Sequence, residues 1–438
     1  MAGRPDLRDG NETGRAPIAA PGPGHPDYYR WVVCGLLFAV TAINYTDRQI
    51  LALLKPQLDR QLHWTNEQYG WANAAFQGAY GVGMFAAGYL IDRFGPRLTY
   101  AVCVAFWSLA ALGHSLAGSV RGFVVARIGL GLSEAGNFPA AIKTVTGCFP
   151  KQERALAIGL FNAGSNAGAI IAPAMVPWVA AAWGWQATFL LAGSAGFIWI
   201  LFWLRWYRAT PAGPREGTNA NRPDAIPWSR LLTIRQTWSF IVAKFVLDPV
   251  WWFFLIWLPD YFKQTRGLDI KRSWPELVTI YGLTTALGVA GSWVSGIWIG
   301  RGWSVTRARK RAMAIFAACM LAILAVDRLG NWPAVWTLGI ACAAFYAYVS
   351  NMFCSVADMF PAGSVASVVS LGSVAGCISG MAFPVFCGRV LDSFAARGDV
   401  GRGYTLLLAI CSVAGLVAFL SSHLLAPSFE PVRQPARA

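Results

Sequence analysis

The sequence predicts an all-α membrane protein with twelve transmembrane helices arranged as two pseudo-symmetric bundles of six. The first reason is composition: of the 438 residues, 56% are hydrophobic and only 13% are charged, whereas soluble domains carry about 25% charged residues. The mean hydropathy of +0.45 points the same way. The second reason is that the apolar residues gather in runs of about 20, and a helix of that length crosses a bilayer core of roughly 30 Å.

Twelve such spans are separated by polar, glycine- or proline-containing breaks. The polar segment 206–236 carries four prolines and divides the spans into two groups of six. We therefore predict an N-terminal tail (1–29), a first bundle (30–205), a linker (206–236), a second bundle (237–424) and a C-terminal tail (425–438). The predicted spans are 31–54, 68–91, 97–117, 121–147, 153–182 and 185–205, then 237–258, 274–300, 310–326, 333–358, 363–390 and 402–424.

Basic residues concentrate on one side of this predicted membrane topology. The tails, the linker and alternate turns are rich in arginine and lysine, as at Arg93, Arg97, Lys151 and Arg154. The positive-inside rule places that side in the cytoplasm, so both termini are predicted to be cytoplasmic. Because this placement explains the net charge of +15, we expect no nucleic-acid partner. Residues 1–27 contain no apolar h-region and predict no cleavable signal peptide.

The residues that enzymes and metal sites use are scattered along the chain. Nine cysteines lie in or beside the apolar spans without a CxxC motif, and the four histidines fall on different segments. We therefore expect no enzyme, no metal and no cofactor. A sensor without transport would be expected to bring a signalling domain, whereas the tails and linker are short and polar.

Two adjacent charges, Asp47 and Arg48, lie deep within the first span. Each costs about 2.5–3.5 kcal/mol on insertion scales, so charges at such depth usually have a function. Neighbouring residues of a helix point about 100° apart, and we expect the two side chains to meet different partners. The alternative is that they only neutralise each other.

The fourth span carries Arg127 and Glu134, seven residues apart and therefore on one helical face. This helix runs opposite to the first, which puts Asp47 at about the depth of Arg127. We predict that Asp47 lies near Arg127 and that Arg48 faces a central cavity. For Glu134 the alternative is a static salt bridge to Arg127 that only holds helices together.

A turn motif occurs once in each half. The first copy runs from Gly88 through Asp92 and Arg93 to Arg97, and the second from Gly296 to Arg301 with Gly300 in place of the acid. Internal repeats of this kind are typical of transporters. With this turn the sequence resembles the major facilitator superfamily over residues 30–424. It also resembles the anion:cation symporters, specifically bacterial hexuronate transporters, in the blocks 44–48, 131–143, 161–166, 248–254 and 357–361.

The resemblance implies roles for individual residues. It assigns proton coupling to Asp47 and Glu134 with Arg127 as their partner, carboxylate binding to Arg48, and substrate contact to Tyr45 and Tyr80. A guanidinium suits this role because it stays charged and binds a carboxylate with two parallel hydrogen bonds. The sequence departs from its relatives at Ser165, where some galactonate transporters have glutamine, and at Ser370 and Ser373, where relatives often have asparagine.

Other polar and aromatic positions are candidates for the same cavity or for gates. The alternative for each is ordinary interhelical contact or, for the tryptophan, an interfacial belt. The substrate candidates are Gln77, Asn162, Ser165, Asn166, Trp252, Asn351 and Ser373, and the gate candidates are Gly88, Asp92, Arg93 and the i, i+4 pair Lys244 and Asp248.

From these features we predict a monomeric, proton-coupled importer of a small anionic sugar acid in the bacterial inner membrane, working by alternating access. A hexuronate is the preferred substrate. The alternatives are an aldonate such as galactonate, an aldarate such as glucarate, an aromatic carboxylate, or export of many compounds. Exporters of hydrophobic cations would not need Arg48.

Overall fold

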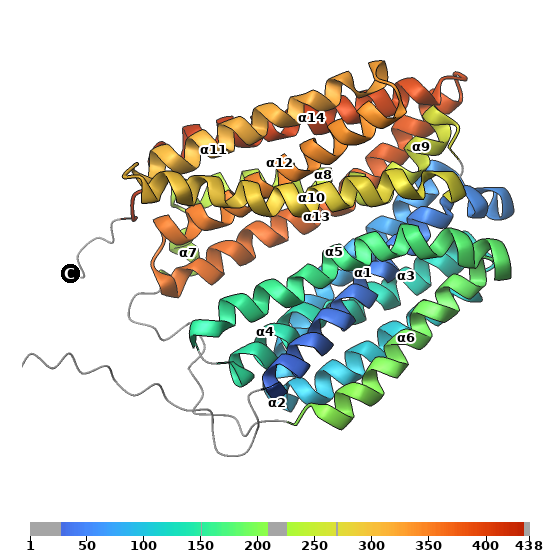
Figure 1. The fold of residues 1–438 in the computed structure, drawn as a ribbon, viewed down its shortest axis with the longest axis horizontal. Helices are drawn as coiled ribbons and strands as arrows, with labels where there is room; N and C mark the ends of the chain where they lie inside the picture. The colour runs from blue at the N-terminus through green and yellow to red at the C-terminus, as the bar shows by residue number, and fades with distance from the viewer. Residues whose placement is uncertain (1–27, 150, 209–225, 269, 433–438) are drawn as a thin grey trace, which may run out of the picture.

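The computed structural model describes residues 28–149, 151–208, 226–268 and 270–432, and all regular elements in this part of the chain are helices. They form two layers, one for each half of the chain (Figure 1). The first half contains α1 (Tyr28–Leu62), α2 (Asn66–Ser115), α3 (Val120–Glu134), α4 (Asn137–Cys148), α5 (Lys151–Trp183) and α6 (Trp185–Trp206). The second contains α7 (Trp228–Leu231), α8 (Arg235–Ile256), α9 (Leu258–Arg266), α10 (Ile270–Gly300), α11 (Val305–Met320), η2 (Leu321–Arg328), α12 (Asn331–Met359), α13 (Ala362–Ala395) and α14 (Val400–Leu425).

These elements make twelve crossings of the bundle, which confirms the predicted fold class. The long α2 supplies two of them, because Gly95 leaves the helical conformation (φ 77°, ψ 162°) and Pro96 starts the returning helix. The pair α3 and α4 forms one crossing, as does α11 with η2. Among the described residues, eight helical segments are long and apolar enough to span a membrane. The other four crossings are α1, the first part of α2, α3 with α4, and α11 with η2, which carry more polar residues or an interruption.

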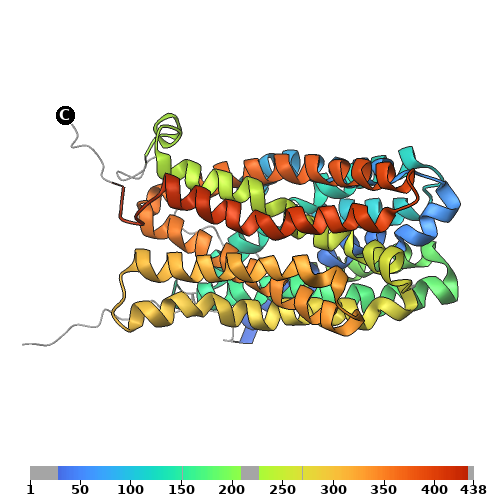
Figure 2. The ribbon, with the colours of Figure 1, turned by 90° about the horizontal axis from the view of Figure 1, so that it is seen from above.

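The two ends of the bundle differ in what they carry. The described chain starts at Tyr28 and finishes at residue 432 at one end, which also holds the turn at Gly95; we call it the terminal end. The other end holds the α1–α2 connection and α9, and we call it the latch end. The two layers of helices lie close together toward the latch end (Figure 1), and Figure 2 shows the bundle from above along the same long axis.

Glycines allow several helices to approach at backbone distance. A Cβ at Gly164 of α5 would lie 2.4 Å from the carbonyl oxygen of Phe38 on α1, and one at Gly131 of α3 would lie 2.4 Å from that of Phe76 on α2. Only a residue without a side chain fits at these points. These contacts join α5 to α1 and α3 to α2 in the first half.

Candidate functional site

The central feature of the first half is an ion pair between α1 and α3. Arg48 Nε lies 2.7 Å from Glu134 Oε2, and the two residues are 8% and 0% exposed. Aromatic rings surround the guanidinium: its carbon lies 4.9 Å from the ring centre of Tyr45 and 4.8 Å from that of Tyr80. Arg48 is therefore a buried cation with one carboxylate partner and aromatic walls, an arrangement suited to binding a second carboxylate.

Asp47 and Arg127 complete a buried group of four charges. They are 2% and 1% exposed. Within the described part of the chain, neither Asp47 oxygen has a hydrogen-bond partner, nor do Nε and Nη2 of Arg127. Asp47 does lie within electrostatic reach of the other three charges. Buried charged groups without hydrogen bonds are costly, so binding a proton or a polar group at these atoms would stabilise the group.

The structure pairs Glu134 with Arg48, whereas the alternative considered from the sequence was a static salt bridge between Glu134 and Arg127. α1 and α3 cross the bundle in opposite directions, and the contact joins residues near the middle of the two crossings.

The helix that carries Glu134 is interrupted directly after it. Residues Ala135 and Gly136 form a turn between α3 and α4. Pro139 lacks the N–H that would bond the carbonyl of Ala135, which explains the interruption. A Cβ at Gly136 would lie 2.5 Å from the Cys103 sulfur, so the turn is packed closely against the second part of α2. Glu134 thus sits at a break in its crossing, as ligand-binding residues of transporters often do.

Several other candidates lie around the interface between the halves. Gln77 is 3% exposed, and its Nε2 has no partner in the described residues. A Cβ placed at Gly380 of α13 would be 3.3 Å from Trp252 Cδ1 and 3.9 Å from Gln77 Cδ. Trp252 of the second half and Gln77 of the first therefore converge on one glycine. Half-buried positions on α5 are Asn162, Ser165 and Asn166.

Two second-half candidates are engaged within their own half. Asn351 is 1% exposed, accepts a hydrogen bond from Ser295 (2.5 Å) and donates one to Ala347 O (2.8 Å). Ser373 donates to Val369 O at 2.9 Å. The sequence reasoning missed Ser295, which also accepts a bond from Arg309 (3.1 Å) and so ties Asn351 into a network between α10, α11 and α12.

The gate candidates fall in two places. Lys244 Nζ lies 2.7 Å from Asp248 Oδ2, and a Cβ at Gly376 of α13 would lie within 1.9 Å of the same oxygen. Gly88 and Arg93 lie in the first part of α2, near the terminal end of the bundle. There Arg93 donates a hydrogen bond to Tyr89 Oη at 2.8 Å. The side chain of Asp92 lies outside the described residues. The described residues contain no group of three His, Cys, Asp or Glu placed to hold a metal.

Twelve crossings in two halves, a buried charge group and an interrupted helix are features of secondary transporters. The family model for the Major Facilitator Superfamily matches residues 37–384. The chain belongs to the major facilitator superfamily. As a member of that superfamily it is a multi-pass membrane transporter and not an enzyme.

The relatives of this major facilitator protein include sugar-acid transporters. It is 32% identical to the galacturonate transporter of Dickeya chrysanthemi, over 56% of this chain and 74% of the relative. It is 28% identical to the hexuronate transporter of Escherichia coli K12, over 89% of this chain and 92% of the relative. Among solved structures, a bacterial homolog of the human lysosomal transporter Spinster matches with a TM-score of 0.79 at 17% identity, covering 92% of this chain and 98% of that one. The last likeness concerns the fold alone.

Proposed function

We propose that this transporter imports a sugar acid together with protons, and that a hexuronate is its substrate. The observation that supports this most is the buried Arg48–Glu134 pair with Tyr45 and Tyr80 beside it. The relatives named for galacturonate and hexuronate transport support the substrate class. We also propose a bacterial inner-membrane location with the terminal end in the cytoplasm, and a monomer that needs no cofactor.

The proposed coupling is a competition for Arg48. While Glu134 is an anion it occupies the guanidinium, and a substrate carboxylate cannot form the same bonds. A proton on Glu134 removes its negative charge and frees Arg48, which then binds the substrate carboxylate with two parallel hydrogen bonds. When the substrate leaves, Arg48 pairs with Glu134 again and the proton is released. Substrate and proton thus travel together.

Asp47 is proposed as a second proton carrier, with Arg127 as the nearby cation. Import of a monoanion with one proton moves no net charge. A second proton would add about 2.3 kcal/mol of driving force for each 100 mV of membrane potential. Gln77, Trp252 and the polar residues of α5 are proposed to contact the sugar hydroxyls and the apolar face of the ring.

The test is uptake of labelled galacturonate and glucuronate into proteoliposomes, with and without an inward proton gradient. We expect accumulation that depends on the gradient and is abolished by Arg48→Ala. The matched control is Arg402→Ala, because that side chain is 80% exposed and pairs with the nearby Asp399. Accumulation without a gradient would contradict proton coupling. If hexuronates were not taken up but galactonate, glucarate or an aromatic acid was, that acid would replace hexuronate as the proposed substrate.

A further inference from the structure

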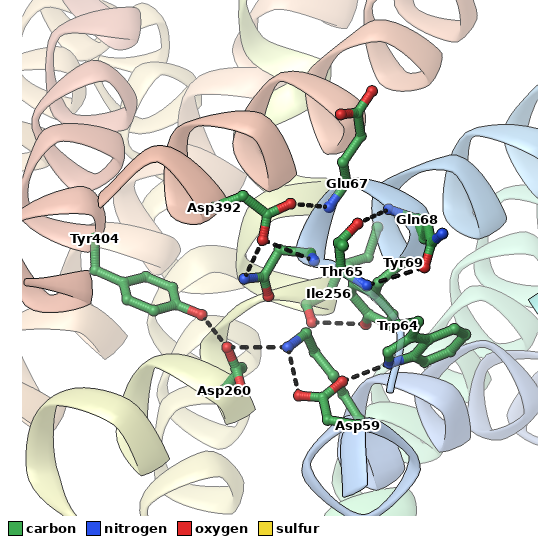
Figure 3. A network of polar contacts seen from close by, with 12 residues as sticks. Asp59, Trp64, Thr65, Glu67, Gln68, Tyr69, Ile256, Asp260, Asp392 and Tyr404 are labelled. Carbon is green, nitrogen blue, oxygen red and sulfur yellow. Dashed lines mark hydrogen bonds and ion pairs between the residues drawn. The ribbon is translucent and has the colours of Figure 1, made fainter. Parts of the chain in front are cut away.

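A buried lysine connects the two halves at the latch end. Lys55 of α1 is 2% exposed and lies 2.9 Å from Asp59 of the same helix and 3.4 Å from Asp260 of α9 in the second half. Asp260 also accepts a hydrogen bond from Tyr404 of α14. Figure 3 shows Asp59, Asp260 and Tyr404 converging on this point. Asp59 and Asp260 both contact the Lys55 ammonium group, but only Asp260 belongs to the other half of the chain.

The start of α2 is capped from the other half. Asp392 of α13 accepts the backbone N–H of Asn66 at 3.0 Å and that of Glu67 at 2.8 Å, and also the Asn66 side-chain amide at 2.9 Å. The first N–H groups of a helix lack partners within the helix, and a carboxylate there is stabilising. The same helix also has a cap of its own, because Thr65 accepts the N–H of Gln68 in a capping box (Figure 3).

Two glycines allow α2 and α13 to touch at backbone distance beside this cap. A Cβ at Gly70 of α2 would lie 2.4 Å from Pro384 O, and a Cβ at Gly388 of α13 would lie 2.3 Å from Asn66 O. The neighbouring Tyr69 donates to Ile256 O of α8 at 3.1 Å. The halves are thus in direct contact at this end, with no space for a substrate to pass between α2 and α13.

We propose that Lys55, Asp260 and Asp392 form a latch that holds the latch end closed and opens in every transport cycle by exchange of partners. When the halves separate, Lys55 keeps Asp59, Asp260 keeps Tyr404, and the start of α2 keeps Thr65. Each of these groups then keeps one hydrogen-bond partner within its own half, which lowers the free-energy cost of opening. Asp392 itself is half-buried and gains water when it is released.

The latch rests on the proposed alternating access, but its test needs no substrate, so failure of the latch and failure of the hexuronate assignment can be told apart. Hydrogen–deuterium exchange is followed by mass spectrometry on the full chain in lipid nanodiscs. For each variant, the exchange rate is measured at a part of the latch that the substituted residue does not contact. Asp260→Asn is read at residues 66–70, and Asp392→Asn is read at residues 258–266.

We expect both variants to speed exchange at the distant segment about tenfold. Losing one hydrogen bond to a charged group changes an opening equilibrium by about this factor. The matched controls remove partners within one half: Asp327→Asn, which loses the hydrogen bond from Tyr261 of α9 and is read at residues 66–70, and Thr65→Ala, read at residues 258–266. Both are expected to leave the distant segment unchanged. Asp392→Glu, which keeps the carboxylate, is expected to restore part of the protection.

Exchange that rises only beside each substitution would overturn the proposal, because it would make these residues local structural contacts. An equal rise in the Asp327→Asn and Asp260→Asn variants would overturn it as well. Thermal unfolding of each variant shows that the folded protein is being compared. Should Asp260→Asn fail to fold, Asp392→Asn decides the question alone, since its side chain lies nearer the surface.

Discussion

Arg48 of α1 and Glu134 of α3 are joined by a contact of 2.7 Å between Nε and Oε2, although 86 residues separate them in the chain. Both are buried, and the aromatic rings of Tyr45 and Tyr80 flank the guanidinium. The proposed substrate-binding cation, Arg48, is thus in direct contact with the proposed proton-carrying acid, Glu134. The effect of a change at one residue therefore depends on the state of the other.

Glu134→Gln is expected to separate binding from coupling. The amide cannot carry the proton or the negative charge, so Arg48 stays available to substrate. We expect exchange of substrate across the membrane to continue while accumulation against a gradient falls to the equilibrium level. Counterflow and gradient-driven uptake in the same proteoliposomes measure this. Loss of both activities in a folded variant would contradict the assignment of Glu134 as the coupling acid, and Asp399→Asn at the exposed latch end serves as control.

Arg48→Lys is expected to weaken substrate binding while the charge is kept. A lysine is a point charge and cannot form two parallel bonds to one carboxylate. Losing one hydrogen bond to a charged group costs about 1.5–3 kcal/mol, so KM should rise roughly 10- to 100-fold. Initial uptake rates over a range of substrate concentrations give KM. An unchanged KM would show that Arg48 does not bind the substrate carboxylate.

Gly131→Ala is expected to destabilise the first half. Its Cβ would lie 2.4 Å from Phe76 O and 3.1 Å from Tyr80 N, so α2 and α3 must move apart. Overpacking of this kind costs about 1–3 kcal/mol. Gly88→Ala is the matched comparison, since a Cβ there has no described atom outside its own helical turn within 4 Å. Thermal unfolding in detergent should show a lower Tm for the first variant only; equal values would contradict the packing argument.

Glu67 gives a dependence on pH at the latch end, outside the membrane-spanning segments. The hydrogen bond from Arg389 lowers the pKa of this carboxyl below its ordinary value of 4.5. A lowered pKa in the folded state means that the contact stabilises the protein above pH 4.5 and that this contribution is lost as pH falls through the lowered value. The Tm difference between wild type and Glu67→Gln should therefore be present at pH 7 and disappear in acid. A difference that grows in acid would contradict this sign.

The four buried charges illustrate how far sequence reasoning reaches. Their depth within apolar spans is visible in the sequence, because hydropathy is a local property of about 20 consecutive residues. Their pairing is not, because it depends on where two helices face each other and which way the side chains lean. Asp47 was expected near Arg127, and the two do lie within electrostatic reach of each other. Arg48 was expected to face a central cavity, and its contact with Glu134 became visible only in the structure. Asn351 was a substrate candidate, and in the structure it accepts a hydrogen bond from Ser295.

The sequence by itself determined the class of fold, the order of the crossings and the residues that are costly to bury. Only the tertiary structure decided the partners. Lys55 lies just beyond the predicted end of the first span, and nothing near it in the sequence indicates Asp260; the same holds for Asn66 and Asp392, which are 326 residues apart. Composition and periodicity act along the chain, whereas hydrogen bonds and ion pairs act over about 3 Å in space. Residues that meet across the interface therefore become recognisable only once the two halves are folded and placed against each other.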